Sequence, residues 1–129
     1  METKSPSQYG ALSLAYVGDS VYEVYVRTQL IDAHPDMPVQ KLHKQAIHFV
    51  NAKGQSDSVH AIMDMLNEEE LAVFRRGRNA KSHTVPKHAE LIDYRHATGF
   101  EALIGYLYLK NDTGRLHEVM KAAYEAVRD

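Results

Sequence analysis

The sequence has no cysteine and no tryptophan, and its 129 residues include only 7 glycines and 4 prolines. Without cysteine, neither a disulfide framework nor a cysteine-bound zinc site is possible, and the chain suits a reducing compartment. Long apolar runs are missing too, so no segment reads as a membrane span or a signal peptide. We therefore expect a cytoplasmic protein with no membrane partner.

A strong charge of either sign is also missing, because the formal net charge is only −2. This value excludes a broadly basic protein but is compatible with a local basic patch. The hydrophobic share of 44% and the charged share of 25% are ordinary for globular proteins. A chain of this length buries a substantial core, so we expect residues 1–129 to form one domain.

Several well-known chemical motifs are absent. The sequence has no P-loop, no G-x-G-x-x-G fingerprint and no G-x-S-x-G elbow. Its 8 histidines form no H-E-x-x-H pattern, and pairs such as His43 and His48 do not share a helix face. We therefore expect isolated surface histidines and no zinc site.

Apolar residues recur at helical spacing, and no segment alternates as a strand would. The predicted fold class is all-α. Two segments carry break or loop signals: residues 51–58 ("NAKGQSDS") and residues 80–88 ("AKSHTVPKH"). A turn is indicated at residues 112–114. A helix N-terminus is predicted at Asn67, which acids follow directly. The expected helices cover residues 9–32, 39–52, 59–66, 67 into the segment 75–81, a segment through 100–109, and 116–127.

The stretch "AYVGDSVYE" places Gly18 and Asp19 inside an apolar helix, with Glu23 one turn later on the same face as Asp19. Glycine is a poor helix residue by about 1 kcal/mol relative to alanine, and a buried carboxylate must be paired, metal-bound or protonated. One interpretation is a functional acid beside a close helix approach. The other is a bend with an acid facing water.

The stretch "ATGFEALIGYLYL" contains a similar anomaly. From 100 to 109 only Glu101 is charged, in a segment too apolar for a surface helix. Glu101 either pairs with a cation, such as Arg95 or an arginine of another helix, or takes part in chemistry. Gly105, one turn later, and Gly18 would each relieve crowding at a helix crossing, so the two helices could cross and bring Asp19 and Glu101 together.

Residues 75–88, "RRGRNAKSHTVPKH", contain five Lys or Arg side chains, several hydrogen-bond donors and no acid. Cations and small donors are what phosphate backbones and 2′-hydroxyls require. A solvated helix end would account for one or two of these charges. We favour polyanion binding by the basic strip, which comprises Arg75, Arg76, Arg78, Asn79, Lys81, Ser82, His83, Thr84 and Lys87.

Carboxylates without thiols or histidine clusters suit the hard cations Mg²⁺ and Mn²⁺. A basic strip beside a carboxylate–Mg²⁺ site is an arrangement for phosphodiester hydrolysis, because the metal activates water and offsets charge in the transition state.

Two stretches, "LAYVGDSVYE" and "TGFEALIGYLYL", resemble the two signature helices of the ribonuclease III catalytic domain. Together with "RRGRNAKS", and with no segment resembling a double-stranded-RNA-binding domain, they are most similar to the Mini-ribonuclease III subfamily. The resemblance runs from about residue 9 to residue 126, with the motifs in the same order.

The resemblance implies an all-helical homodimer with a valley for double-stranded RNA between two Mg²⁺-dependent sites, at which Mn²⁺ would substitute. Each site would cut one strand and leave 5′-phosphate and 3′-hydroxyl ends. Members of the subfamily mature the ends of bacterial 23S ribosomal RNA, and a ribosomal-protein helper would suit so small an interface. Asp19 and Glu101 match the metal-binding acids of the family.

Two positions depart from the longer ribonuclease III enzymes: Ala15 and Thr98 stand where those enzymes have acids, as is usual in the subfamily. With two carboxylates per site, water or phosphate must complete the metal shell. Thr98 would then orient a water, and Glu23 would supply an outer contact. The alternative is a non-catalytic RNA-binding or scaffolding module, against which the presence of both acids argues.

Overall fold

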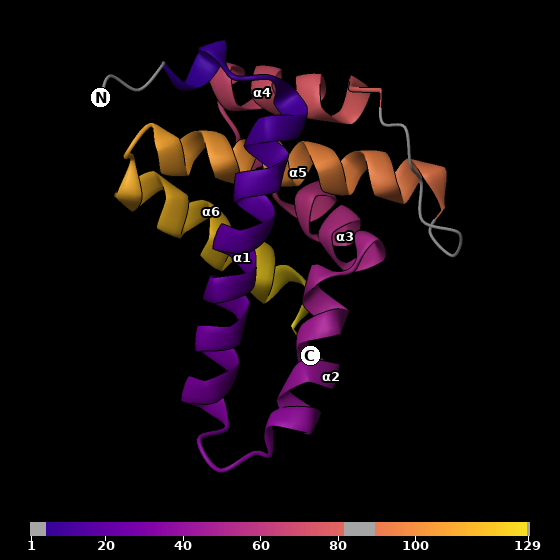
Figure 1. The fold of residues 1–129 in the computed structure, drawn as a ribbon, viewed down its shortest axis with the longest axis vertical. Helices are drawn as coiled ribbons and strands as arrows, with labels where there is room; N and C mark the ends of the chain where they lie inside the picture. Colours follow the sequence, from indigo (N-terminus) through magenta and orange to yellow (C-terminus); the bar gives the residue numbers. More distant parts are fainter. Residues whose placement is uncertain (1–4, 82–89, 129) are drawn as a thin grey trace.

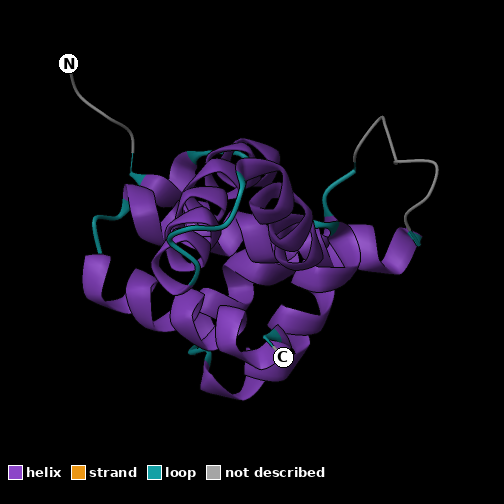
Figure 2. Cartoon of the chain, turned by 90° about the horizontal axis from the view of Figure 1, so that it is seen from below, coloured by secondary structure: helices purple, strands orange, loops and turns teal. Residues whose placement is uncertain are grey.

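The fold is a set of helices arranged around one central helix, in a computed structural model that describes residues 5–81 and 90–128. No strand occurs within these residues (Figure 2), which confirms the all-α prediction. The helices are η1 (Pro6–Gln8), α1 (Ala11–Ala33), α2 (Val39–Val50), α3 (Ala52–Ile62), η2 (Met63–Met65), α4 (Glu68–Asn79), α5 (Leu91–Leu109) and α6 (Thr113–Val127).

Helix α5 is the centre of this arrangement. Every residue from 97 to 107 is buried except Glu101, which is half-buried. Helix α1 crosses α5, and α3, α4 and α6 also pack on α5. Helix α2, which leads into α3, lies alongside the C-terminal half of α1 (Figure 1). A side chain at position 101 therefore sits inside the helix layer, and the rest of α5 supplies the apolar surroundings.

Helix α1 is apolar on more than one face. Its buried residues repeat every fourth position, as in Leu14, Gly18, Tyr22, Val26 and Leu30. Other apolar residues of α1 lie off this buried face: Leu12 is 42% exposed, Tyr16 83% and Val24 66%. The helix prediction is confirmed, while an apolar stripe of α1 remains uncovered in the single chain.

The break expected over residues 51–58 occurs at Asn51 only, and the expectation is wrong for residues 52–58, which are helical. Asn51 alone separates α2 from α3, and its side-chain oxygen accepts a hydrogen bond of 2.7 Å from the Gly54 amide, which caps α3. A Cβ on Gly54 would overlap the His48 carbonyl, so glycine here allows the close junction of the two helices. Polar, turn-favouring residues thus form the first turn of a helix.

The expected start of α4 is confirmed by reciprocal hydrogen bonds between Asn67 and Glu70, a capping box. The predicted turn at 112–114 is shorter than expected, since Asp112 caps α6 and the next two residues are already helical. Residues 80 and 81 lie outside helices as predicted, and 82–88 lie outside the described part of the chain. None of the described helices has the length and apolarity that crossing a membrane requires.

Candidate functional site

Helices α1 and α5 cross at two glycines. A Cβ on Gly18 would overlap the backbone carbonyl of Glu101, and a Cβ on Gly105 would overlap the backbone carbonyl of Leu14. No other residue type fits either position without separating the helices. The predicted crossing of the two helices at glycines is confirmed. It places Gly18, and with it the neighbouring Asp19, directly against Glu101.

At this crossing the carboxyl groups of Asp19 and Glu101 meet and share a hydrogen bond. Asp19 lies toward solvent, whereas Glu101 is half-buried. Burial, followed by the hydrogen bond and the charge of Asp19, raises the pKa of Glu101 to about 9. The alternative pairing of Glu101 with an arginine is not found, since no Lys or Arg of the described segments forms an ion pair with it.

A third polar group lies at the crossing, Gln55 of α3, which the sequence did not predict as a site residue. Its side chain is 1% exposed, and its amide nitrogen donates to Glu101 Oε2 at 3.4 Å and to the Val50 carbonyl at 3.1 Å. Its Oε1 is buried and accepts no hydrogen bond from the described residues. Nothing in the segment "NAKGQSDS" signals this role, because it depends on how α3 lies against α5.

The donor set at the crossing fits a hard divalent cation. It offers carboxylate oxygens and the free oxygen of a buried amide, with no sulfur or imidazole. Across residues 5–81 and 90–128, no three His, Cys, Asp or Glu side chains cluster closely enough to enclose a metal by themselves. Two carboxylates suit Mg²⁺, which usually keeps several of its waters.

The two residues suggested for supporting roles have other contacts. Glu23 pairs with Arg27 at 3.4 Å, one turn further along α1; the Arg27 side chain is exposed and that of Glu23 is half-buried. The Thr98 hydroxyl donates to the Tyr94 carbonyl at 2.9 Å. These contacts leave an outer contact from Glu23 and a water oriented by Thr98 as predictions.

The described part of the basic strip divides into two faces of α4. Arg76 donates to the Tyr9 carbonyl at 3.0 Å and so ties α4 to the chain before α1. Arg78 lies over the Phe74 ring at 5.8 Å and donates to the Asn79 side chain at 3.1 Å. Arg75 and Lys81 are exposed. The strip residues Ser82, His83, Thr84 and Lys87 lie outside the described residues.

Two histidines connect the strip with the acidic crossing, which corrects the expectation of isolated surface histidines. The rings of His60 and His96 are 4.4 Å apart, and His96 stacks parallel to Phe74 at 6.0 Å. Burial, together with the nearby His60 and Arg78, lowers the pKa of His96. Since Gln55 meets Glu101 and His60 meets His96, α3 and α5 run antiparallel, with the histidines about 7 Å along from the acids.

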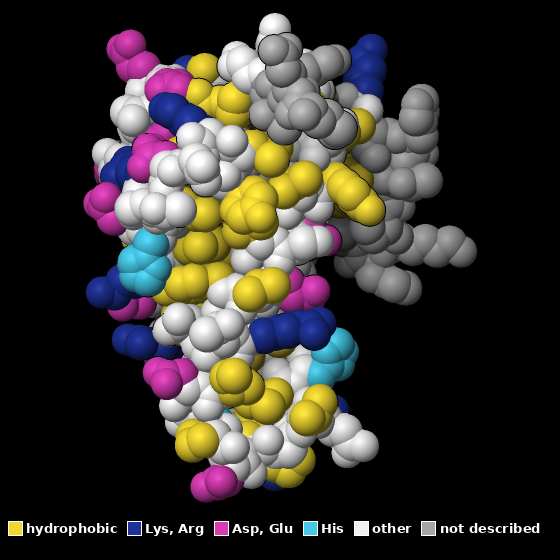
Figure 3. Space-filling model, turned by 60° about the vertical axis from the view of Figure 1, so that its left-hand side comes forward, with side chains coloured by type: hydrophobic (Ala, Val, Ile, Leu, Met, Phe, Trp, Pro, Cys, Tyr) yellow, Lys and Arg dark blue, Asp and Glu magenta, His cyan; other side chains and the backbone are white. Residues whose placement is uncertain are grey.

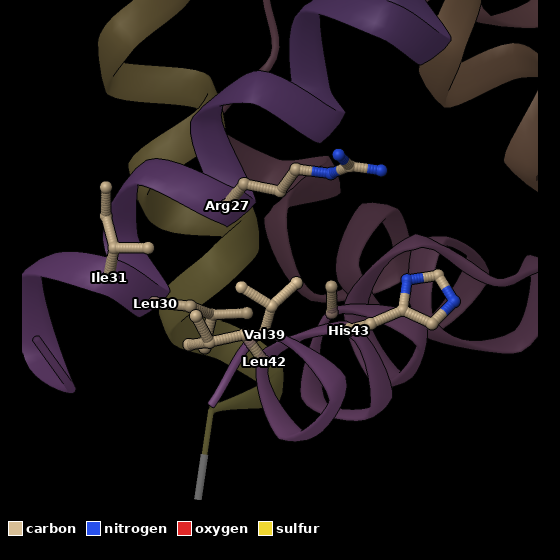
Figure 4. Close-up of a pocket in the computed structure, with 7 residues that line it drawn as sticks. Arg27, Leu30, Ile31, Val39, Leu42 and His43 are labelled. Carbon is tan, nitrogen blue, oxygen red and sulfur yellow. The ribbon is translucent and has the colours of Figure 1, made fainter. Parts of the chain in front are cut away.

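An apolar hollow lies elsewhere, between the end of α1 and α2 (Figure 4). Its lining residues are Arg27, Leu30, Ile31, Val39, Leu42, His43 and Ala46. None of them is a predicted site residue, so the hollow is separate from the acidic crossing.

Known proteins are similar to this sequence over most of its length. The pattern of the family described as "Ribonuclease III domain" matches residues 12–112. A Mini-ribonuclease 3 of Clostridium tetani is 54% identical over 114 residues, 88% of this chain and 76% of the relative. A Mini-ribonuclease 3 of Symbiobacterium thermophilum is 43% identical over 127 residues, 98% of this chain and 97% of the relative.

A crystal structure of a Fusobacterium nucleatum protein superimposes with a TM-score of 0.84 at 28% identity, over 95% of this chain and 98% of the other. The fold and these matches thus define an all-α protein of the hydrolase class that acts on RNA, an endoribonuclease. The chain belongs to the ribonuclease III domain family. Enzymes of this family act on double-stranded RNA and generally use divalent metal ions.

Proposed function

We propose that this protein cleaves double-stranded or structured RNA in a Mg²⁺-dependent reaction, with Mn²⁺ as a substitute, and that Asp19 and Glu101 are its metal-binding catalytic residues. The observation that carries the proposal is the meeting of these two carboxyl groups at the glycine crossing without a Lys or Arg partner among the described residues. Holding two acids together without a cation lowers the stability of the folded protein. Such an arrangement is typical of a site that binds a cation.

When bound, the metal would supply an activated water and offset negative charge at the scissile phosphate, leaving 5′-phosphate and 3′-hydroxyl ends. Glu101 has to lose its proton to bind a cation, and its raised pKa means that metal binding releases that proton near neutral pH. The exposed Asp19 gives the site access to solvent and substrate. In this proposal Glu23 and Thr98 remain outer contacts.

The basic strip supplies the RNA contact. Arg75 and Lys81 are exposed, and Arg78 leads through Phe74 and His96 to His60, beside the crossing. In this proposal a phosphate backbone extends over the surface from the cationic end of α4 toward the exposed His60 and the acids. A-form RNA is recognised mainly by shape and backbone, so structural context would select the substrate more than base identity.

The substrate we propose is the precursor of bacterial 23S ribosomal RNA, cleaved in the cytoplasm at its ends, with a ribosomal protein as helper. The support is the match to relatives that carry the name Mini-ribonuclease 3 over most of their length. We further propose that residues 1–129 act as one catalytic domain.

The protein acts as a homodimer in this proposal, and the uncovered stripe of α1 supports it. Tyr16 is 83% exposed and Val24 66%, and Val24 borders a hollow with Tyr108, which is 51% exposed. Figure 3, a view of the side that carries α1 and α6, shows hydrophobic side chains running down this face, with charged side chains gathered along its left edge. Exposed aromatic and aliphatic residues gathered on one face are typical of an interface.

The deciding experiment incubates the protein with a 23S precursor stem, with and without Mg²⁺, and maps the ends produced. Wild-type protein should cleave only with Mg²⁺. Asp19→Asn and Glu101→Gln should each lower cleavage on the order of a thousandfold while RNA binding persists, because each removes a metal ligand worth several kcal/mol. Asp57→Asn is the matched control, since Asp57 is an exposed acid paired with Lys53.

Binding of the RNA by wild-type protein without any Mg²⁺-dependent product would favour the non-catalytic scaffolding module instead. Full cleavage by Asp19→Asn would refute the proposed site.

A further inference from the structure

Gln55 is a buried polar residue whose position in the helix layer is not explained by packing alone. It lies in the first turn of α3, is 1% exposed, and contacts Glu101 at the α1–α5 crossing. Burying an amide costs free energy unless its donors and acceptor are all satisfied. Here the donors are used, while Oε1 accepts no hydrogen bond from residues 5–81 and 90–128, so the side chain is organised around the carboxyl group that it contacts.

The amide nitrogen of Gln55 has two fixed partners. It donates to the Val50 carbonyl, across the junction of α2 and α3, and to Glu101 Oε2. The junction itself is rigid, because Asn51 caps α3 and Gly54 fits closely against the His48 carbonyl. A donor held by a rigid element fixes the orientation of the group that accepts from it.

We propose that Gln55 is a positioning residue that holds one oxygen of Glu101, and so presents the carboxylate to the divalent cation, with its free Oε1 available to the waters of the metal shell. This inference rests on the proposed metal site. By engaging Oε2, Gln55 limits rotation of the Glu101 carboxyl group and leaves its other oxygen for the cation. A neutral amide does this without adding a third negative charge to the acid pair.

A purely structural glutamine would act only through the Val50 carbonyl, and its loss would lower stability without changing metal affinity. The experiment therefore compares Gln55→Met, an apolar side chain of similar length, with Gln55→Asn, which keeps the amide but is one methylene shorter. Gln45→Met is the matched control, because Gln45 is an exposed glutamine of the neighbouring helix α2.

Mn²⁺ binding is measured by calorimetry, thermal unfolding by circular dichroism, and cleavage of a 23S precursor stem across a Mg²⁺ titration. We expect both Gln55 variants to bind Mn²⁺ about 10- to 100-fold more weakly. The Mg²⁺ concentration for half-maximal cleavage should rise by a similar factor, while the KM for RNA at saturating Mg²⁺ and the behaviour of Gln45→Met stay at the wild-type level.

Wild-type Mn²⁺ affinity in either folded variant would overturn this inference and leave the proposed function standing. Wild-type protein that neither binds Mn²⁺ nor cleaves RNA would overturn both. If Gln55→Met fails to fold, Gln55→Asn decides alone, since its amide keeps the buried position polar.

Discussion

The α-carbon of Gly18 lies against the backbone carbonyl of Glu101, so closely that a single added methyl group would overlap it. This contact sets the distance between α1 and α5, and Asp19 and Glu101 meet because of it. Gly105 makes the reciprocal contact with the Leu14 carbonyl. The acid pair therefore depends on two residues that carry no chemistry of their own.

Replacing Gly18 with alanine should destabilise the protein by about 1–3 kcal/mol, because overpacking a tight contact forces the helices apart. Gly105→Ala should behave alike. Cleavage should fall further than stability, since moving Asp19 away from Glu101 weakens the metal site. Thermal unfolding and cleavage assays measure these two effects.

The control is Gly114→Ala in α6, where an added Cβ meets nothing within 4 Å. That change should be neutral or stabilise by less than about 1 kcal/mol.

Unchanged stability of Gly18→Ala would show that the crossing tolerates a wider separation than the structure indicates.

The acid pair could be predicted from sequence because both acids are out of place. Glu101 is the one charge in an apolar stretch, and Gly18 is an unfavourable helix residue beside Asp19. Such anomalies are local and remain visible without a structure. That the two helices cross at the glycines follows from the same residues, because only glycine permits the approach.

Gln55 could not be predicted, for the opposite reason. Its segment is polar and resembles a turn, and the residue acquires its role only when α3 lies antiparallel to α5. The buried face of α1 was equally hidden. Because Leu14 and Tyr22 alternate with Leu12 and Tyr16 around a largely apolar helix, periodicity predicts the helix but does not choose which face is covered.

The raised pKa of Glu101 makes stability depend on pH. Between its ordinary value of 4.5 and about 9, the folded protein holds a proton that the unfolded chain has released. The free energy of unfolding of the metal-free protein should therefore fall as pH rises toward 9. Denaturant titrations in EDTA from pH 7.5 to 9 measure this range, in which the lowered pKa of His96 no longer contributes.

Glu101→Gln should remove that pH dependence, because the amide has no proton to lose. A slope in the variant equal to the wild-type slope would assign the effect to other groups.

We expect substitutions on the two faces of α4 to differ in their effect on RNA affinity. Arg75→Ala and Arg78→Ala should each weaken binding and reduce the slope of log K against log salt by about 1, as expected for one lost phosphate contact. Arg76→Ala should affect stability more than binding, since Arg76 donates to the Tyr9 carbonyl. Lys121→Ala on α6 is an exposed control. Filter-binding or anisotropy titrations at several salt concentrations give the slopes, and equal slopes for Arg75→Ala and Lys121→Ala would remove Arg75 from the interface.

The exposed stripe of α1 predicts how the proposed homodimer breaks. A tyrosine buried at the centre of an interface contributes about 2 kcal/mol or more, roughly 30-fold in Kd. Tyr16→Arg also places a charge in an apolar surface, so the variant should elute as a single chain at concentrations where wild type is a dimer. Val39→Arg tests an equally uncovered residue on α2, 78% exposed, and should remain dimeric.

Light scattering after size exclusion gives the mass of each variant directly. The dimer interface must include Tyr16 if the apolar stripe of α1 is what it covers. A Tyr16→Arg protein of twice the single-chain mass would place the interface on another surface. In that case the exposed apolar side chains of α1 would need a different partner.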